Sequence, residues 1–333
     1  MTREVSSRHI YLKMHLHIEG FRQQRWIRCS QRNLTSGGLM MTSLRSWVNA
    51  LIVYSCVCAI DLLAQEKPWV TAYYAGWMQS YMPPKEIDFS ALTHIIHFAV
   101  LPEGGGLVNV EANGVSKGAR ELVQVAHAAG KKVLLCIGGA NTELGFAEAT
   151  SPVYRDRFVQ NLIAYTKSVG YDGIDVDWEP MSPKYRDQFV WFILELRRLL
   201  DSHWLLTAAG GDPEVYKQVH KYLDQINIMT YDMSGAWGGW VTWHNSPLFN
   251  GGARFPLRWR YLPCVDQIVQ DYIAAGIPAR KIGIGIDFYG YIWSGGNGTP
   301  TGGVTSPQQR WNDPPKVQDN VPFSDLVSRF GGF

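Results

Sequence analysis

Residues 171–180 read Tyr-Asp-Gly-Ile-Asp-Val-Asp-Trp-Glu-Pro, and no other stretch of the sequence says as much about the fold. Acidic residues stand at Asp175, Asp177 and Glu179, each separated from the next by one apolar residue. Since a β-strand points successive side chains to opposite faces, the three carboxyl groups share one face and the apolar residues pack on the other. Crowding and desolvation raise the pKa of at least one such carboxyl group. The stretch therefore predicts a buried strand that presents an acid catalyst.

An acidic surface strand, a calcium loop and a magnesium site are the alternatives for this stretch. The apolar residues between the acids are too hydrophobic for a solvated edge strand. A calcium loop needs a glycine at its turn and an acid at its twelfth position, and the sequence has neither. Clustered carboxylates also suit a hard cation, so these residues alone leave the magnesium alternative open.

The composition of the 333 residues is that of a globular protein with a large core, with 46% hydrophobic and 18% charged residues. The net charge of +2 is unevenly spread, because residues 1–64 carry eight basic and three acidic side chains. Residues 65–333 are mildly acidic overall and have no basic patch that would indicate nucleic-acid binding. Beyond residue 64 the cysteines are Cys136 and Cys264, without disulfide or zinc spacing.

The beginning of the chain resembles a targeting segment. Residues 41–64 combine a short charged start, an apolar run and a small residue before the expected cleavage point, which is typical of a secretory signal peptide. The run is short for a membrane span, so we expect a secreted, extracellular protein without stable membrane insertion, with an N-terminal anchor as the alternative. Residues 1–40 are expected to be a leader without structure, and Met40 or Met41 is the expected start.

From Trp69 onward, short apolar strands alternate with longer amphipathic stretches. The predicted strands are 70–75, 94–100, 132–137, 173–178, 205–209, 225–230 and 281–287. The predicted helices are 117–129, 152–169, 183–200, 213–222 and 261–275. Nearly continuous apolar strands are typical of a parallel sheet buried on both faces. The alternation predicts a (β/α)8 TIM barrel of the α/β class. An open doubly wound sheet is the alternative, but the first strand lacks a glycine-rich phosphate loop after it.

The end of the chain shows no convincing eighth strand. After Asp287 the sequence becomes rich in glycine, proline and asparagine as far as Pro315. Residues 65–333 are therefore expected to form an incomplete barrel of seven recognisable strands, truncated at its C-terminus. The first and seventh strands would then have unpaired edges.

These residues together resemble glycoside hydrolase family 18, the chitinases. The family signature D-x-x-D-x-D-x-E stands here as Asp172, Asp175, Asp177 and Glu179. Further segments that resemble the family are 73–77, 136–139, 229–233, 244–248 and 288–290, so the likeness spans roughly residues 69–295. Three features depart from the family: Cys136 replaces a serine, Tyr291 replaces an arginine, and the eighth strand with its tryptophan is missing.

The resemblance implies a chitinase that hydrolyses β-1,4 bonds between N-acetylglucosamine units with retention, by substrate-assisted catalysis. It implies that Glu179 is the acid and base, that Asp177 orients the acetamido group, that Asp175 shares a proton with Asp177, and that the Tyr231 hydroxyl holds the acetamido oxygen. The residues expected to bind substrate are Tyr73, Trp77, Gly138, Gly139, Met229, Asp232, Trp237 and Trp293. The expected partner is chitin or a chitooligosaccharide, and the expected state is a monomer without metal or cofactor.

Two other functions remain open from the sequence. One is an endo-β-N-acetylglucosaminidase acting on glycans or peptidoglycan, and the other is a non-catalytic chitin-binding lectin. Lectin-like members typically lack the terminal glutamate, whereas this chain keeps Glu179, which disfavours the lectin. Asp172 precedes the strand and is out of step with the alternation of Asp175, Asp177 and Glu179, so it is expected to be structural. Trp178 points away from the acids and is expected in the core.

Overall fold

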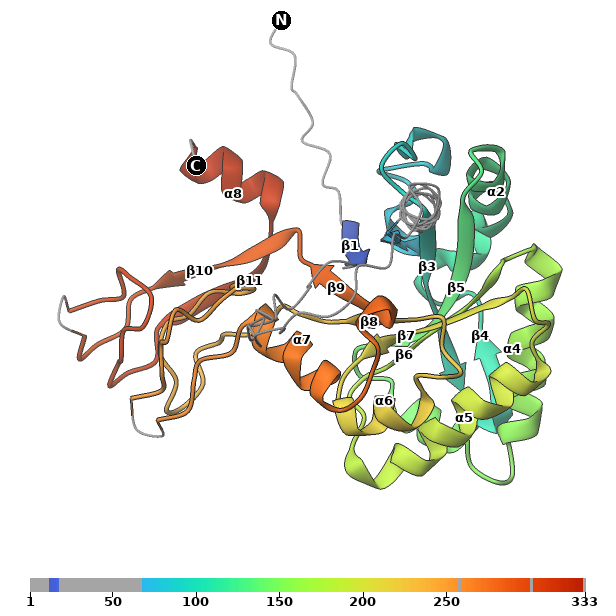
Figure 1. Ribbon diagram of the computed structural model, residues 1–333. Helices are drawn as coiled ribbons and strands as arrows, with labels where there is room; N and C mark the ends of the chain where they lie inside the picture. The colour runs from blue at the N-terminus through green and yellow to red at the C-terminus, as the bar shows by residue number, and fades with distance from the viewer. Residues whose placement is uncertain (1–11, 18–67, 257–258, 300–301, 332–333) are drawn as a thin grey trace, which may run out of the picture. The chain divides into compact units, whose positions relative to one another are not determined.

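The computed structural model describes residues 12–17, 68–256, 259–299 and 302–331 (Figure 1). The predicted signal peptide and most of the predicted leader lie outside these residues. Seven parallel strands follow one another, and each matches a predicted strand. They are β2 (Val70–Ala75), β3 (His94–Glu103), β5 (Lys132–Gly139), β6 (Gly173–Trp178), β7 (Leu205–Gly210), β8 (Gln225–Ile228) and β9 (Ile282–Ile286). The prediction of an incomplete (β/α)8 barrel with seven recognisable strands is therefore confirmed.

The sheet closes through a strand that the sequence analysis did not predict. Strand β1 (Leu12–His17) pairs antiparallel with β2 on one side and with β9 on the other, so neither of these strands has an unpaired edge. The expectation of two open edges was wrong, because the backbone of β1 satisfies both. The structure departs here from the prediction that residues 1–40 are a leader without structure, since six of them form this strand.

Helices follow most of the parallel strands, as the alternating pattern predicts. They are α2 (Val115–Ala128), α3 (Glu143–Ala149), α4 (Arg155–Val169), α5 (Arg186–Leu199), α6 (Pro213–Val219) and α7 (Val265–Ala274). All five predicted helices are present, and the short α3 is additional. Helix α6 begins where its sequence indicates: the Asp212 side chain accepts a hydrogen bond from the Glu214 N–H, and Pro213 occupies the first turn. No helix in the described ranges is both long and apolar enough to cross a membrane.

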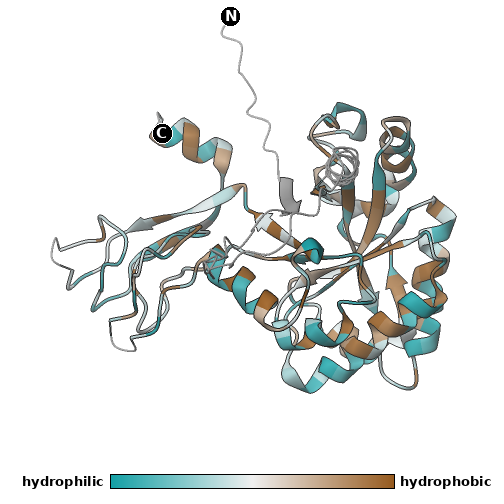
Figure 2. Ribbon diagram, viewed as in Figure 1, coloured by the Kyte–Doolittle hydropathy of each residue, from teal (hydrophilic) through white to brown (hydrophobic). Residues whose placement is uncertain are grey.

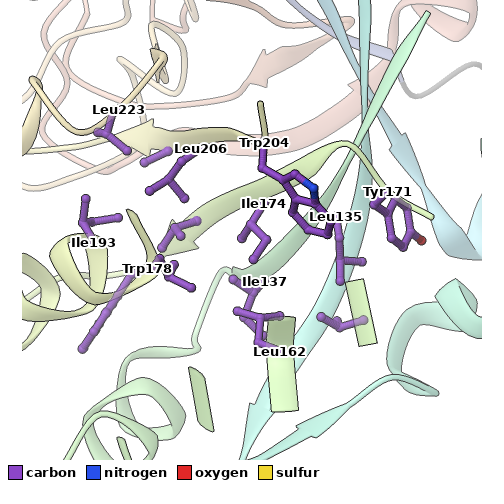
Figure 3. Packing of buried hydrophobic residues seen from close by; sticks show 14 of the residues in the cluster. Leu135, Ile137, Leu162, Tyr171, Ile174, Trp178, Ile193, Trp204, Leu206 and Leu223 are labelled. Atoms are coloured by element: carbon purple, nitrogen blue, oxygen red, sulfur yellow. The ribbon is translucent and has the colours of Figure 1, made fainter. Parts of the chain in front are cut away.

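Most of the core lies between the sheet and the helices. Figure 3 shows Ile174 and Trp178 of β6 packed with Leu135 and Ile137 of β5 against Leu162 and Ile193 of the helices. The strands are largely apolar and the helices are banded with polar and apolar residues, as Figure 2 shows. A smaller cluster is formed by strand side chains that point to the opposite face of the sheet, away from the helices. Its buried members are Tyr73, Ile96, Ala99, Leu134 and Cys136. Asp175 and Asp177 of β6 point to the same face as this second cluster, because Asp175 lies opposite Cys136 in the register of the sheet. They therefore point away from the helices.

The C-terminal part of the described chain forms a separate hairpin. Strands β10 (Tyr289–Ser294) and β11 (Lys316–Pro322) pair antiparallel and are followed by α8 (Phe323–Phe330). A short strand β4 (Leu107–Asn109) pairs with the end of β3. The 3-10 helices are η1 (Gly76–Met78), η2 (Pro84–Glu86), η3 (Gly104–Gly106), η4 (Ala112–Gly114), η5 (Pro183–Tyr185) and η6 (Ala279–Lys281). The sequence analysis predicted no strand or helix after β9.

Candidate active site

Two of the three predicted catalytic carboxyl groups lie in strand β6, and the third follows it at the C-terminal ends of the parallel strands. Asp175 and Asp177 are fully buried, while Glu179 follows the last strand residue and is half-buried. The intervening side chains all belong to the core on the opposite face; they are Ile174, Val176 and Trp178. The predicted alternation is confirmed. It places the two buried acids beneath a third that solvent can reach.

Hydroxyl groups from two other strands hold Asp175. Tyr73 of β2 donates its hydroxyl to Asp175 Oδ2 at 3.0 Å, and Thr207 of β7 donates to Oδ1 at 2.5 Å. The Tyr73 oxygen in turn accepts a hydrogen bond from Asn227 Nδ2 at 3.1 Å. Burial raises the pKa of Tyr73 well above its ordinary value, and the neighbouring Asp175 raises it further. Tyr73 is therefore a neutral hydroxyl donor to the acid, and its predicted contact with substrate stays a prediction.

Tyr231 lies just beyond β8 and shares its surroundings with two of the acids. Burial raises the pKa of its hydroxyl well above the ordinary value, and the carboxylates of Asp177 and Glu179 are the next causes. The ring also packs edge-on against Tyr289, with 6.2 Å between the centroids. The carboxyl groups of Asp177 and Glu179 therefore lie near enough to the Tyr231 hydroxyl to act on its charge, although these residues come from the ends of two different strands. A tyrosine that stays protonated there is a permanent hydrogen-bond donor.

Gly138 and Gly139 allow the end of β5 to pass close to the neighbouring groups. Gly138 is in register with Asp177, and a Cβ atom on it would lie 2.0 Å from the Asp177 carbonyl oxygen. Its φ of +115° is also one that other residues rarely adopt. A Cβ atom on Gly139 would lie 2.8 Å from the ring of Phe98. At both residues only a glycine fits without displacing a neighbour, and their predicted contact with sugar stays a prediction.

Asp232 stands next to Tyr231 at the centre of a polar network. Its Oδ1 accepts hydrogen bonds from the hydroxyls of Tyr289 and Tyr291, each at 2.7 Å. Its backbone N–H donates to Asn245 Oδ1 at 2.8 Å. The Asn245 amide also donates to Asp287, whose pKa is raised by burial. The network holds the exposed Asp232 carboxylate in place next to Tyr231.

The predicted aromatic subsites lie on three separate loops or strands. Trp77 is 49% exposed and packs edge-on against Phe98, while Trp237 is 48% exposed and packs edge-on against Trp240. Trp293 of β10 is half-buried and lines a pocket of about 530 Å³. Met229 is half-buried directly after β8. No described contact tests whether these residues bind sugar, so that part of the assignment stays a prediction.

The two residues that were expected to be structural have structural contacts. Asp172 accepts hydrogen bonds from the side chains of His127 and Lys132, each at 2.7 Å, and from the backbone N–H of Val133. Trp178 stacks on Phe146 with 4.5 Å between the ring centroids. Both predictions are confirmed. Within the described ranges, no group of three or more His, Cys, Asp or Glu side chains is arranged to hold a metal ion, so the geometry gives the magnesium alternative no support.

Comparison with known families gives one family match over most of the described chain. The family described as "Glycosyl hydrolases family 18" matches residues 70–325, which covers the barrel strands β2–β9 and the C-terminal hairpin. The chain belongs to this family.

The similar family 18 proteins include curated sequences and solved structures. Chitinase 1 of Aphanocladium album is 34% identical over 194 residues, which cover 53% of this chain and 45% of that protein. Ostrinia furnacalis Group IV chitinase in complex with allosamidin is 25% identical with a TM-score of 0.63, covering 78% of this chain and 77% of that one. Cycas revoluta GH18 chitinase in complex with (GlcNAc)3 is 22% identical with a TM-score of 0.64, covering 78% and 80%. The chain spans about half the length of the curated relatives that it matches.

The sequence analysis missed several polar residues of this family 18 site. Thr207 and Asn227 contact Asp175 and Tyr73 from neighbouring strands. The available signal was a polar residue inside an otherwise apolar strand, as in Leu-Leu-Thr-Ala-Ala of β7. A buried hydroxyl or amide needs a partner, so such a position points to a polar interior.

Proposed function

We propose that this chain is a chitinase that hydrolyses β-1,4 bonds between N-acetylglucosamine units with retention of configuration. The observation that carries the proposal is the convergence of Asp177, Glu179 and Tyr231 at the end of β6 and β8. This set supplies one acid that solvent can reach, one buried carboxyl group and one neutral hydroxyl donor. The family 18 relatives that are named chitinases support the same activity.

The acid step belongs to Glu179. It is half-buried at the rim of the barrel, where a glycosidic oxygen can approach it, and it donates a proton as the bond to the leaving sugar breaks. A retaining mechanism also needs a nucleophile on the opposite side of the anomeric carbon. Asp175 and Asp177 share with Glu179 one face at the same strand, so neither lies across the glycosidic bond from the acid. The nucleophile then comes from the substrate, whose 2-acetamido oxygen attacks its own anomeric carbon and gives an oxazolinium ion.

Tyr231 and Asp177 serve this internal attack. The Tyr231 hydroxyl donates to the acetamido oxygen and holds it beneath the anomeric carbon. The acetamido group is then already oriented for attack, so less orientational freedom is lost on the way to the transition state. Asp177 accepts the acetamido N–H and stabilises the positive charge that develops on the ring. Water then attacks the anomeric carbon while Glu179, now a carboxylate, takes its proton. Two inversions at the same carbon give net retention, and Glu179 returns to the acid form.

Two further features of the proposal concern substrate and location. The neighbours that were solved with allosamidin and with (GlcNAc)3 support an N-acetylglucosamine polymer as the substrate class. The exposed Trp77 and Trp237 suit stacking against sugar rings along such a polymer. We also propose secretion into the extracellular space, on the basis of the signal-like residues 41–64.

Product analysis of chitohexaose incubated with the full chain tests the proposal. The chain should release shorter chitooligosaccharides, and Glu179→Gln should abolish release while leaving the protein folded. Glu214→Gln is the matched control, because Glu214 is an exposed residue of α6 whose side chain pairs with Lys217 on the surface, and it should cleave like the parent. Folded parent protein that releases no product from chitohexaose would contradict the proposal. So would equal release by the Glu179→Gln variant.

A further inference from the structure

The turn after β8 carries Tyr231 next to a residue in an uncommon backbone conformation. Strand β8 ends at Ile228, and residues 230–233 lead the chain away from the sheet. Asp232, directly after Tyr231, has a φ of +56°, a left-handed value that residues other than glycine rarely adopt. Such a conformation persists where the surrounding contacts hold the backbone. The contacts that fix residues 230–233 therefore also fix where the Tyr231 side chain begins.

Two adjacent residues of the loop between β8 and α7 supply these contacts. Asn245 Oδ1 accepts a hydrogen bond from the Asp232 N–H at 2.8 Å, and the Asn245 carbonyl oxygen accepts one from the Met233 N–H at 3.0 Å. The hydroxyl of Ser246 donates to the carbonyl oxygen of Thr230 at 2.6 Å. The loop thus holds the turn on both sides of its tyrosine.

Asp287, the residue after β9, orients the side chain of Asn245. Asn245 Nδ2 donates to Asp287 Oδ2 and lies 3.5 Å from the carbonyl oxygen of Tyr289. A side-chain amide can turn either its oxygen or its nitrogen to a neighbour, whereas a carboxylate only accepts hydrogen bonds. The Asp287 carboxylate therefore selects the orientation in which the amide nitrogen faces it and the amide oxygen faces the Asp232 N–H. The reversed amide would place two donors against each other.

The position of Asp287 is not one that packing favours. All five residues of β9 are isoleucine or glycine, so the carboxyl group stands at the end of an apolar strand. Burial raises the pKa of Asp287, and the nearby Asp232 carboxylate raises it further, whereas the hydrogen bond from Asn245 lowers it. A carboxylate that is costly to keep there is stabilised by the contact that it makes with Asn245.

From these contacts we propose that Asn245, oriented by Asp287, is a positioning residue for Tyr231. It fixes the turn so that the tyrosine hydroxyl stands where it can hold the acetamido oxygen of the substrate. This role rests on the chitinase activity proposed above, in which that hydroxyl is the donor. Asn245 and Asp287 act through the backbone of residues 230–233 and take no part in proton transfer or in breaking the glycosidic bond.

Amide hydrogen exchange of the full chain, resolved at the Asp232 N–H by NMR, tests the hold on the turn without any substrate. Asn245→Ala removes the acceptor of this N–H, so its exchange should become about tenfold faster. Asp287→Ala should also speed the exchange. The variant with both substitutions should exchange no faster than Asn245→Ala, because Asp287 acts through Asn245.

Asn250→Ala is the matched control for this measurement. Asn250 belongs to the same loop, but its amide donates to the carbonyl oxygen of Leu262 at 3.2 Å, so the variant should leave the exchange of Asp232 unchanged. Unchanged exchange at Asp232 in Asn245→Ala would overturn the proposal. So would an effect of Asp287→Ala that adds to that of Asn245→Ala.

Initial rates on chitohexaose test the catalytic consequence. Asn245→Ala should lower kcat about tenfold, with a smaller change in KM, because the Tyr231 hydroxyl is no longer held. In a Tyr231→Phe background the same substitution should lower kcat by less than about twofold, whereas a general loss of structure would lower it in both backgrounds. A tenfold fall in both backgrounds, or no fall in the parent background, would overturn the proposal.

Two additions keep these tests decisive. Thermal melts establish that each variant is folded, and Asp287→Ala, with the same expected direction of change, replaces Asn245→Ala if that variant does not fold. A parent chain that hydrolyses nothing would refute the chitinase activity, whereas the exchange measurement would still decide whether Asn245 holds the turn.

Discussion

Tyr291 donates its hydroxyl to Oδ1 of Asp232 at 2.7 Å, and this contact links the C-terminal hairpin to the residue that follows Tyr231. Tyr289, on the same face of β10, donates to the same oxygen. Family 18 members often carry an arginine where this chain has Tyr291, so here a neutral hydroxyl takes the place of a positive charge. Two tyrosine hydroxyls therefore hold the Asp232 carboxylate in place next to Tyr231.

Removing the Tyr291 hydroxyl should weaken the hold on Asp232 and thereby substrate binding. Tyr291→Phe removes one hydrogen bond to an exposed carboxylate, so we expect KM for chitohexaose to rise about fivefold. We expect kcat to stay within about twofold, because the hydroxyl holds Asp232, which takes no part in the proposed reaction steps. Steady-state kinetics with Tyr261→Phe as the control, a tyrosine on a surface loop, measure both constants. A large fall in kcat with constant KM would contradict this account of Tyr291.

Removing the Tyr231 hydroxyl should slow the chemical step. Tyr231→Phe loses the donor that holds the acetamido oxygen, and we expect kcat to fall about 100-fold with little change in KM. Tyr272→Phe is the matched control, since the Tyr272 hydroxyl donates to the Gly211 carbonyl oxygen at 2.8 Å and serves the fold alone. Initial rates on chitohexaose compare the two variants. Equal rates for Tyr231→Phe and the parent would exclude a role for the hydroxyl in the reaction.

A single methyl group at Gly138 should disturb the strand that carries the acids. Gly138→Ala places its Cβ atom against the Asp177 carbonyl oxygen at a strained φ, and we expect a loss of about 3 kcal/mol of unfolding free energy or more. Gly130→Ala also has a positive φ, of +70°, but its Cβ atom meets nothing within 4 Å, so about 1 kcal/mol is expected. Urea unfolding followed by tryptophan fluorescence gives both values. Similar losses for the two variants would show that close packing at Gly138 is unimportant.

The buried His97 should make the protein less stable in acid. Burial lowers the pKa of His97 to about 3, while the ring contacts the Tyr171 hydroxyl at 2.8 Å through Nδ1. The unfolded chain takes up a proton near pH 6.5 that the folded chain resists until about pH 3. Stability from this residue is therefore full above pH 6.5 and is lost as the pH falls, by about 3 kcal/mol between pH 7 and pH 4.

Urea unfolding at several pH values isolates this contribution. His97→Gln should reduce the pH dependence of the unfolding free energy over pH 7 to 4. His203→Gln, at an exposed position, should leave it unchanged. An identical pH dependence in the parent and in His97→Gln would show that His97 takes up its proton without unfolding.

The barrel could be predicted from the sequence because its strands carry a strong local signal. In β6 the alternation of acids and apolar residues determines the faces as well as the strand, so Asp175, Asp177 and Trp178 all lie where that pattern places them. The helices follow from their amphipathic repeats. The hairpin of β10 and β11 was missed because 21 residues rich in glycine and proline separate its strands, which hides a pairing between distant segments.

Other features depend on three-dimensional neighbours that no local pattern reveals. Strand β1 is recognised by its pairing with β2 and β9, which lie at opposite ends of the catalytic domain in sequence. Thr207 and Asn227 each look like an isolated polar residue until the register of the sheet brings them to Asp175 and Tyr73. The identities of the acids could be read from the motif, whereas the Thr207 hydroxyl that contacts Asp175 could not.

The configuration of the first product tests the substrate-assisted mechanism most directly. Proton NMR of chitohexaose at early times of hydrolysis, with the fully de-N-acetylated hexamer as the comparison substrate, reports both the anomer and the need for the acetamido group. The account predicts that the β-anomer forms first and that the de-N-acetylated hexamer is not cleaved. Initial release of the α-anomer, or hydrolysis of the de-N-acetylated hexamer at a similar rate, would contradict it.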